Sequence, residues 1–169
     1  MAFSRPPLLS GIGRKVFQQQ IIRMFKEFIK YTEVSDARII STFSSSKKNL
    51  PEAEFLFSHV LNAQHIWTCR IKGTLPFYQR FQIHTKQSFQ SLHTENIENL
   101  YALLDTDLER IVKYSNTEGG YFESKISDIL FHLVNHSTYH RAQIAMNFRL
   151  NGIQPPVTDF ITLKRENLL

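Results

Sequence analysis

The sequence contains few residues that would cross-link a small fold or break a long helix. Cys69 is the sole cysteine among 169 residues, so no internal disulfide can form, and we expect a reducing compartment. Six glycines and six prolines leave ample room for long helices. No apolar run approaches the roughly 20 residues of a membrane-spanning helix, and residues 1–7 lack the apolar core of a secretory signal. These absences predict a cytoplasmic protein with no membrane partner.

The charged residues lean to the basic side but are not concentrated. The formal net charge is +5 and the isoelectric point is about 9.4, which raises the question of nucleic acid. Basic residues nevertheless come in runs of two at most, as at Arg14-Lys15 and Lys47-Lys48. A nucleic-acid footprint is usually a concentrated patch or a recognisable module. We therefore expect a solvated cationic surface and no nucleic-acid partner.

Apolar residues recur at helical spacing in four segments, and turn-forming residues separate these segments. The second segment begins at Pro51, a residue suited to a first helical turn. The third has Thr94 as its expected N-cap, and the fourth is closed by Gly152. The four helices are predicted over residues 14–42, 51–71, 94–111 and 124–151.

The remaining segments are predicted to be connections. Residues 75–89 are expected to be irregular, and Glu118-Gly119-Gly120-Tyr121 predicts a tight turn with two short strand-like flanks. Residues 1–12 are an irregular lead-in, and the tail at 157–169 is expected to return onto the helices. The sequence therefore predicts a single all-α domain over residues 1–169. It is a four-helix bundle with a short hairpin-like turn before the last helix, and such bundles often hold a metal in their interior.

Three histidines, His132, His136 and His140, recur at intervals of four within the fourth predicted helix. Positions four apart on a helix lie one above the other, roughly 6 Å apart. Two imidazoles so placed can bind one metal ion, whereas His132 and His140 are about 12 Å apart. The helix therefore predicts a half-site made of one adjacent pair, completed by a ligand from elsewhere in the chain.

Helical angles indicate which histidines face the core. On the fourth helix His140 lies closest to the apolar axis and His132 furthest from it, which favours the pair His136 and His140. On the second helix His59 falls within the apolar arc, and His65 falls on the opposite face. A polar side chain in an apolar arc must be paired, because unpaired burial is costly. We predict His59, His136 and His140 as metal ligands and His65 as a surface residue; the alternative is a set of hydrogen-bonded core histidines.

Other polar residues need a separate interpretation. His84 and His93, in the irregular segment and near a helix start, are given no role. Arg141 lies beside the apolar axis of the fourth helix, where a long cation is unexpected unless it is paired or faces a cavity. It either binds an anion beside the metal, extends to the bundle edge, or pairs with a carboxylate such as Asp159. Arg70 raises the same question at a helix end, where reaching solvent is easier.

Two segments resemble the DinB family. The fourth predicted helix reads D-I-L-F-H-L-V-N-H-S-T-Y-H-R-A-Q-I over residues 128–144, and G-I-Q-P-P-V-T-D-F follows at residues 152–160. In the second helix, His59 is followed eight residues later by Trp67, which we otherwise expect to be a core anchor. The resemblance covers nearly the whole chain, and its specific part is the fourth helix. Ala142 stands where the family often has glycine, a small change that leaves the metal site intact.

The resemblance implies a four-helix bundle in which three histidines hold a divalent metal, often in homodimers. Matched residue by residue, His59, His136 and His140 would be the ligands, in agreement with the helical angles. The wider superfamily includes transferases and isomerases that depend on small thiols, and the DNA-damage association of the family name does not imply DNA binding. Zinc or nickel suits these imidazole ligands, and iron, manganese and copper remain alternatives.

Three histidine ligands leave a metal position open, as in catalytic rather than structural zinc sites. An open position can take a thiol as thiolate or activate a water. No Asp or Glu lies beside the histidines in sequence, which makes hydrolysis less attractive. The leading hypothesis is a metal-dependent transferase that moves a small thiol onto an electrophile, with Arg141 holding a carboxylate. The alternative is a non-catalytic protein in which the metal joins two helices.

Overall fold

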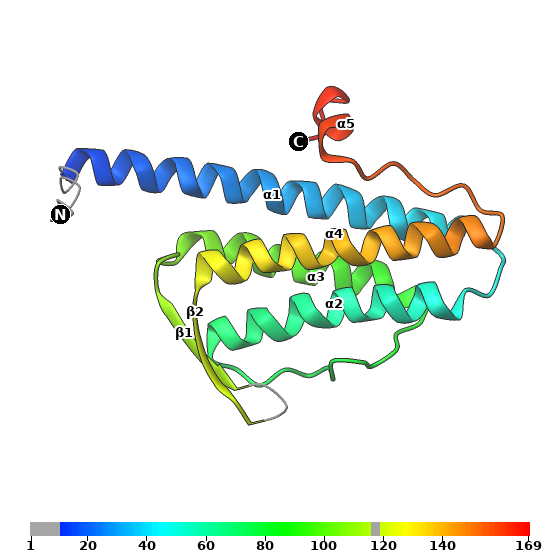
Figure 1. Ribbon diagram of the computed structural model, residues 1–169, viewed down its shortest axis with the longest axis horizontal. Coiled ribbons are helices and arrows are strands. Elements are labelled where there is room, and N and C mark those ends of the chain that lie inside the picture. The colour runs from blue at the N-terminus through cyan, green and yellow to red at the C-terminus, as the bar shows by residue number, and fades with distance from the viewer. Residues whose placement is uncertain (1–10, 116–118) are drawn as a thin grey trace, which may run out of the picture.

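The computed structural model describes residues 11–115 and 119–169, and these residues are largely helical (Figure 1). The all-α prediction is confirmed, with a small sheet added at one end. Within the described residues, no helix is long and apolar enough to cross a membrane. The elements, with η for single 3₁₀ turns, are α1 (Gly11–Ser45), α2 (Pro51–Lys72), η1 (Lys86–Ser88), α3 (Phe89–Ala102), η2 (Leu103–Asp105), β1 (Ile111–Ser115), β2 (Tyr121–Lys125), α4 (Ile126–Leu150) and α5 (Phe160–Arg165).

Three of the four predicted helices lie close to where the sequence placed them, but the third does not. It begins at Phe89 rather than at Thr94, and it ends well before Ile111, which is the first residue of β1. The helix stops because the N–H and hydroxyl groups of Thr106 both donate to the carbonyl of Leu103, at 3.1 and 2.7 Å. This turn reverses the chain toward the hairpin. Of the predicted lead-in, residues 1–10 lie outside the described residues, and residues 11–12 belong to α1.

The strands β1 and β2 form the predicted hairpin before α4. They pair antiparallel, from Ile111 opposite Lys125 to Ser115 opposite Tyr121. The N–H of Ile126 donates to the carbonyl of Arg110 at 3.1 Å, which ties the start of α4 to the chain before β1. Part of the predicted tight turn, Glu118 included, lies outside the described residues.

Gly73 sends the chain back along the helix it has just left. Its φ of 70° is in the left-handed region, which glycine adopts without a steric penalty. The N–H of Thr74 donates to the carbonyl of Cys69 at 2.9 Å and closes the turn. Residues 74–88 then run beside α2 (Figure 1), and we call them the covering segment.

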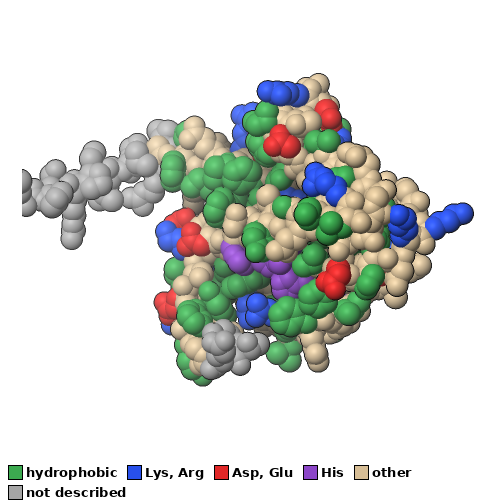
Figure 2. All heavy atoms as spheres, turned by 45° about the vertical axis from the view of Figure 1, so that its right-hand side comes forward, with side chains coloured by type: hydrophobic (Ala, Val, Ile, Leu, Met, Phe, Trp, Pro, Cys, Tyr) green, Lys and Arg blue, Asp and Glu red, His purple; other side chains and the backbone are tan. Residues whose placement is uncertain are grey.

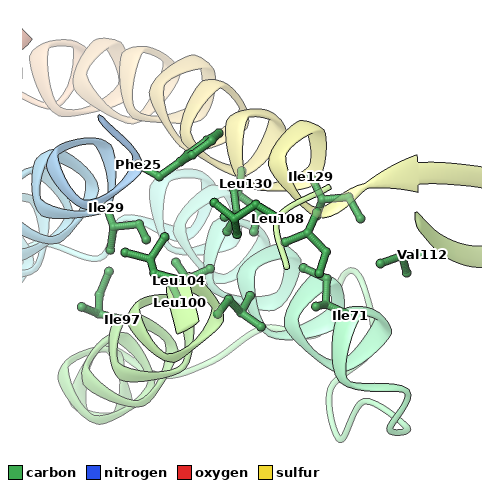
Figure 3. Packing of buried hydrophobic residues seen from close by; sticks show 13 residues of the cluster. Phe25, Ile29, Ile71, Ile97, Leu100, Leu104, Leu108, Val112, Ile129 and Leu130 are labelled. Carbon is green, nitrogen blue, oxygen red and sulfur yellow. The ribbon is translucent and has the colours of Figure 1, made fainter. Parts of the chain in front are cut away.

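The bundle interior consists of two apolar clusters with a polar layer between them. The first cluster, at the hairpin end, includes Phe25, Ile97 and Leu130 (Figure 3). The second, at the other end, is rich in aromatic rings, which meet edge to face at centroid distances near 5 Å, as Phe43 and Phe148 do at 5.1 Å. The buried polar side chains between the clusters are Thr32, Ser35, Asp36, Gln64, Asn96, Ser137 and Arg141.

The C-terminal tail returns onto α1, as the sequence suggested. The ring of Phe160 in α5 contacts Tyr31 edge to face at 5.4 Å, and Lys164 pairs with Glu27 at 2.8 Å. The hydroxyl of Tyr31 also donates to the carbonyl of Thr158 at 3.0 Å. These contacts hold the tail on the side of α1 that carries Tyr31.

Candidate metal centre

Three histidines from two helices meet beside the polar layer. His59 lies on α2, and His136 and His140 lie one turn apart on α4. Each offers one ring nitrogen, and these three nitrogens all lie within 4.8 Å of one another. Nε2 of His59 and Nε2 of His136 are 3.2 Å apart. The structure thus brings together the three histidines that the helical angles selected.

Two of the three imidazoles have their tautomer fixed from outside the cluster. Nδ1 of His59 donates to the carbonyl of Arg80 at 3.1 Å, and Nδ1 of His140 donates to Oε1 of Gln143 at 2.8 Å. A carbonyl oxygen can only accept, so in each neutral ring the proton lies on Nδ1 and the lone pair on Nε2. Both Nε2 lone pairs are therefore left for the interior of the cluster.

The spacing of the nitrogens fits a bound metal ion. A tetrahedral ion with metal–nitrogen distances of about 2.1 Å separates its ligand nitrogens by about 3.4 Å, close to the 3.2 Å between His59 and His136. Nδ1 of His136 is buried with no hydrogen-bond partner among the described residues. Inward lone pairs at this distance need a cation or a shared proton between them. Three converging imidazole nitrogens are a donor set for a divalent metal.

Burial favours the neutral form of His59 and His136, and metal binding requires neutral imidazoles. The pKa of His136 is lowered to about 3, first because burial penalises the imidazolium and then because other positive charges lie near it. Burial also lowers the pKa of His59, partly offset by its hydrogen bond to the carbonyl of Arg80. At neutral pH both rings are thus in the form that binds a metal.

His132 lies outside the cluster, one turn before His136. Its ring centroid is 5.5 Å from that of His136 and 5.6 Å from Trp67, and it does not belong to the group of three converging nitrogens. Trp67 is half-buried and packs against the apolar cluster at the hairpin end, in agreement with its predicted role as a core anchor. The histidine row drifts across the face of α4, so His132 lies beside Trp67, about two turns beyond His59 on α2, and not beside His59 itself.

The prediction that His65 is a surface residue is wrong, because its side chain is buried. The N–H of Phe77 donates to Nε2 of His65 at 3.0 Å, and the ring of Tyr78 lies 4.7 Å away. Sγ of Cys69 is 3.6 Å from the same nitrogen. His65 does lie opposite the apolar arc of α2, but the covering segment returns over that face. The periodicity of one helix carries no information about a connection that later covers it.

Polar contacts attach the covering segment to α2. Nε2 of His84, a residue given no role from the sequence, lies 2.6 Å from Oδ1 of Asn62. The N–H of His84 donates to Oγ of Ser58 at 3.0 Å, and Nδ2 of Asn62 donates to the carbonyl of Gln82 at 2.7 Å. These contacts place Phe81 on the ring of His59, at a centroid distance of 5.2 Å and an interplanar angle of 23°.

His136 and His140 are partly exposed, whereas His59 is buried. Figure 2 shows histidine side chains at the surface beside a hollow, next to hydrophobic groups and with a lysine or arginine side chain at its edge. An open groove also runs along α4, lined among others by His136, Tyr139 and Gln143. The cluster is therefore within reach of small molecules.

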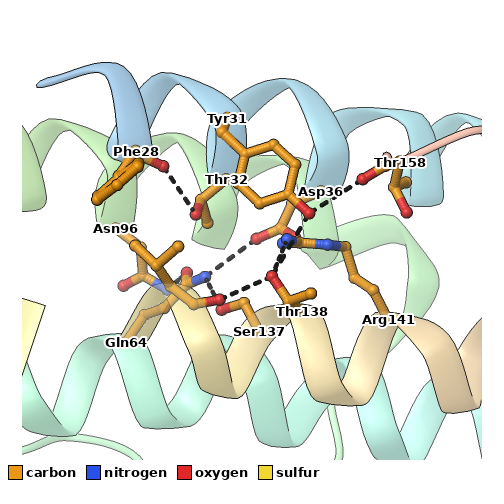
Figure 4. A network of polar contacts seen from close by, with 11 residues as sticks. Phe28, Tyr31, Thr32, Asp36, Gln64, Asn96, Ser137, Thr138, Arg141 and Thr158 are labelled. Carbon is orange, nitrogen blue, oxygen red and sulfur yellow. Dashed lines mark hydrogen bonds and ion pairs between the residues drawn. The ribbon is translucent and has the colours of Figure 1, made fainter. Parts of the chain in front are cut away.

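Arg141 points into the polar layer, toward Asp36 and Thr138 (Figure 4). Its Nη1 lies 2.7 Å from Oδ1 of Asp36, and the two side chains are 1% and 0% exposed. Its Nη2 donates to Oγ1 of Thr138 at 2.9 Å. The carboxylate partner is thus Asp36 and not Asp159, which instead caps the N-terminus of α5. A guanidinium enclosed in this way is not open to a ligand, so the anion-binding interpretation of Arg141 loses its basis.

The polar layer sets the rotation of α4 about its axis. Ser137 and Arg141 face the interior, and Nε2 of Gln64 on α2 donates to Oγ of Ser137 at 3.3 Å. Successive helical residues differ by about 100°. Fixing Ser137 and Arg141 inward therefore turns the preceding residues, His136 and His140, toward α2.

Sequence reasoning missed three residues that shape the site. Gln143 orients His140, and its position three residues later on the same helix could have indicated that contact. Asp36 pairs with Arg141. The helical spacing of apolar residues in α1 is interrupted around Asp36, and this interruption could have indicated a buried polar residue there. Arg80 orients His59 through a backbone carbonyl, for which no side-chain pattern gives a signal.

Fold and site together define a helical bundle with a three-histidine cluster suited to a divalent metal. The sequence model of the DinB family matches residues 37–167, which include α2 and α4 and all three histidines. The chain therefore belongs to the DinB family, and the resemblance is confirmed. It is also 27% identical over 153 residues to Protein DinB of Bacillus subtilis (strain 168), covering 84% of each protein.

Proposed function

We propose that this protein binds a divalent metal and transfers a small thiol to an electrophilic substrate. The observation that carries the proposal is the pair of inward lone pairs on His59 and His140, each fixed by an acceptor outside the cluster. Outer acceptors of this kind orient metal-binding histidines and raise their basicity. Zinc or nickel suits the donors best, with iron, manganese and copper as alternatives.

Three protein ligands would leave a tetrahedral metal one position for a small molecule. When bound, the metal would supply the positive charge that ionises a thiol near neutral pH. The sulfur forms a bond to the electrophilic carbon, the leaving group departs with the bonding electron pair, and the thiol proton passes to solvent. In the part of the chain that the structure describes, no Asp or Glu joins the histidine cluster. Hydrolysis would need such a base, so thiol transfer is the better fit.

The protein contributes orientation and partial exclusion of water. The ring of Phe81 covers one face of His59, and the covering segment is fastened to α2 behind it. His59 is only 8% exposed, whereas His136 and His140 are half-buried. A ligand would therefore approach from the side of α4 and meet a partly dry site, where electrostatic interactions are stronger than in water.

The second candidate is a non-catalytic protein in which the metal joins α2 to α4. This candidate is favoured by the positions of the histidines, because His59 and His136 are 77 positions apart in the chain and a metal between them would cross-link two distant segments. A fourth protein ligand would close the site and support this candidate. Among the described residues, the cluster contains three histidines and no further His, Cys, Asp or Glu.

We also propose a cytoplasmic homodimer, as expected from the family resemblance. Exposed apolar side chains on α4, such as Phe131 and Tyr139, and on α1, such as Phe17 and Met24, support a second copy as partner. Cys69 is buried and unpaired, in keeping with a reducing compartment. Light scattering would show twice the chain mass for a dimer and the chain mass if this proposal is wrong.

Cobalt substitution tests the thiol chemistry directly. A small thiol added to the cobalt-loaded protein should add a sulfur-to-metal charge-transfer band in the near ultraviolet. The band should be absent in His140→Ala, which lacks a ligand, and present in the matched variant His132→Ala. If no thiol changes the wild-type spectrum although cobalt is bound, the transferase proposal fails and the non-catalytic candidate stands.

A further inference from the structure

Two arginines lie at the edge of the histidine cluster without a carboxylate partner. Within the described residues, neither Arg70 nor Arg80 forms an ion pair with Asp or Glu. Arg80 is exposed and Arg70 half-buried. Both lie close to the aromatic rings beside the cluster.

Aromatic rings hold both guanidinium groups in place. Cζ of Arg80 lies 4.9 Å from the ring centroid of Phe81, the ring that stacks on His59. Cζ of Arg70 lies 4.5 Å from the ring centroid of Trp67, which in turn contacts His132. Nη2 of Arg70 also donates to the carbonyl of Ser115 at 3.3 Å. Cation–π contacts fix a guanidinium and leave the N–H groups that have no other partner available for a planar anion.

Arg80 lies against the cluster on the side of His59. Its carbonyl accepts from Nδ1 of His59 at 3.1 Å, and its guanidinium lies over the ring of Phe81, which stacks on His59. The charge of Arg80 also contributes to the lowered pKa of Arg70, where burial is the main cause. Two neighbouring guanidinium groups that have no carboxylate partner among the described residues attract an anion.

We infer that Arg80, assisted by Arg70, binds the anionic group of the ligand whose reacting atom occupies the open side of the histidine cluster. The ligand class is a small thiol, or its electrophilic partner, that carries a carboxylate. A guanidinium matches a carboxylate with two parallel hydrogen bonds, which gives orientation as well as affinity. This inference rests on the proposed function, and it gives Arg80 the role that the sequence suggested for Arg141.

Two thiols that differ in one group provide the test. 3-Mercaptopropionate carries a carboxylate where 3-mercaptopropionamide carries a neutral amide. Titrated into the cobalt-loaded wild type and followed by the charge-transfer band, the carboxylate should bind about tenfold more tightly or better. Arg80→Gln should reduce this ratio to near one and leave the affinity for the amide unchanged, and Arg70→Gln should reduce it in part. Comparing ratios between variants cancels the small difference in thiol acidity.

Arg149→Gln is the matched control, because Arg149 is exposed on the same helix as His140 but roughly 13 Å further along it. It should keep the wild-type ratio. A ratio near one in the wild type, or an equal ratio in wild type and Arg80→Gln, overturns the inference while leaving the thiol chemistry intact.

The anion site is tested separately if neither thiol binds cobalt. Trp67 is the sole tryptophan and lies under Arg70, so its fluorescence reports on an anion at this place. Glutarate, which has no thiol, should then give a saturable change in the zinc-loaded wild type and in Arg149→Gln, and none in Arg80→Gln. That result would refute the proposed function and keep the anion site. An identical response in wild type and Arg80→Gln, or no response, refutes the anion site.

Discussion

At the residue scale, each imidazole of the cluster differs in what lies behind it. Nδ1 of His59 donates to a backbone carbonyl, Nδ1 of His140 donates to the amide oxygen of Gln143, and Nδ1 of His136 has no hydrogen-bond partner among the described residues. A backbone acceptor survives any side-chain substitution, whereas Gln143 can be replaced. The contribution of outer contacts is therefore accessible to experiment at His140.

The first prediction concerns the ligands themselves. His59→Ala, His136→Ala and His140→Ala should each lose bound metal, because two nitrogens hold a divalent ion far less tightly than three. His65→Ala and His132→Ala should retain it. Elemental analysis after gel filtration measures the metal content of each variant. Loss in His132→Ala together with retention in His140→Ala would show that the other adjacent pair binds the ion.

The second prediction concerns the residue behind a ligand. Gln143→Leu should weaken metal affinity by about 10- to 100-fold, because the ring of His140 loses the acceptor that fixes its tautomer. Gln143→Glu keeps an acceptor at the same place and should bind at least as tightly as the wild type. Competition with a chromophoric chelator measures both constants. Equal affinities for the leucine variant and the wild type would mean that Gln143 does not orient the site.

At the scale of elements, the ion pair between Asp36 and Arg141 joins α1 to α4. Removing one partner leaves a buried charge alone, so Arg141→Met should lower the free energy of unfolding by about 3–5 kcal/mol. The double substitution Asp36→Leu with Arg141→Met removes both charges and should recover most of that loss. Urea denaturation measures both effects.

The same double variant separates stability from positioning. If the ion pair holds the rotation of α4, metal affinity in the double variant should remain below that of the wild type although its stability is restored. Wild-type affinity with restored stability would show that packing alone orients His136 and His140.

Helical periodicity predicted α2 and α4, and with them the three histidines that converge, because the spacing of apolar residues along a long helix shows which of its faces is buried. The apolar row of α1 passes from Thr32 to Ile39, and the positions between them include Asp36, the buried partner of Arg141. When the apolar repeat of a helix stops for one turn and then resumes, the polar residue in the gap is expected to be buried and paired. The partner could not be chosen from the sequence, because it depends on how α1 lies against α4.

The covering segment marks the limit of what periodicity can predict. Its residues have no repeating pattern, so the sequence indicated only that they are irregular. They nevertheless bury His65, place the Arg80 carbonyl on His59 and bring Phe81 onto the same ring. Such contacts follow from the path of the chain after Gly73 and from polar groups on α2, and neither is visible in a helical pattern. The end of α3 was missed for a similar reason, because a local turn at Thr106 stops the helix within an apolar repeat.

At the scale of the whole molecule, buried neutral imidazoles make the metal-free protein sensitive to acid. The pKa of His136 is about 3 in the folded protein against 6.5 ordinarily. Between these values the unfolded chain binds more protons than the folded one, so the free energy of unfolding falls as the pH falls. The stabilisation is complete above pH 6.5 and is lost progressively toward pH 3. From pH 6.5 to 5, His136 alone accounts for up to about 2 kcal/mol.

Urea denaturation in the presence of a chelator, at pH 7.5 and 5, measures this loss. The pKa values of His59 and His132 are also lowered by burial, so both add to the effect in the same direction. His136→Gln should show a flatter dependence than the wild type. A wild-type stability that does not change between these pH values would mean that His136 titrates normally in the folded chain.

The separation of the ligands along the chain has a consequence for the order in which the protein is made. His59 leaves the ribosome long before α4 exists, and the pair on α4 can act alone only as a weak half-site. An ion held by all three histidines would therefore enter once α2 and α4 are in place. Loading would then be a late step, open to whichever divalent ion is free at that moment, because imidazole nitrogens discriminate poorly among the later first-row metals. We expect the metal found in purified protein to reflect the supply in the cell as much as the preference of the site.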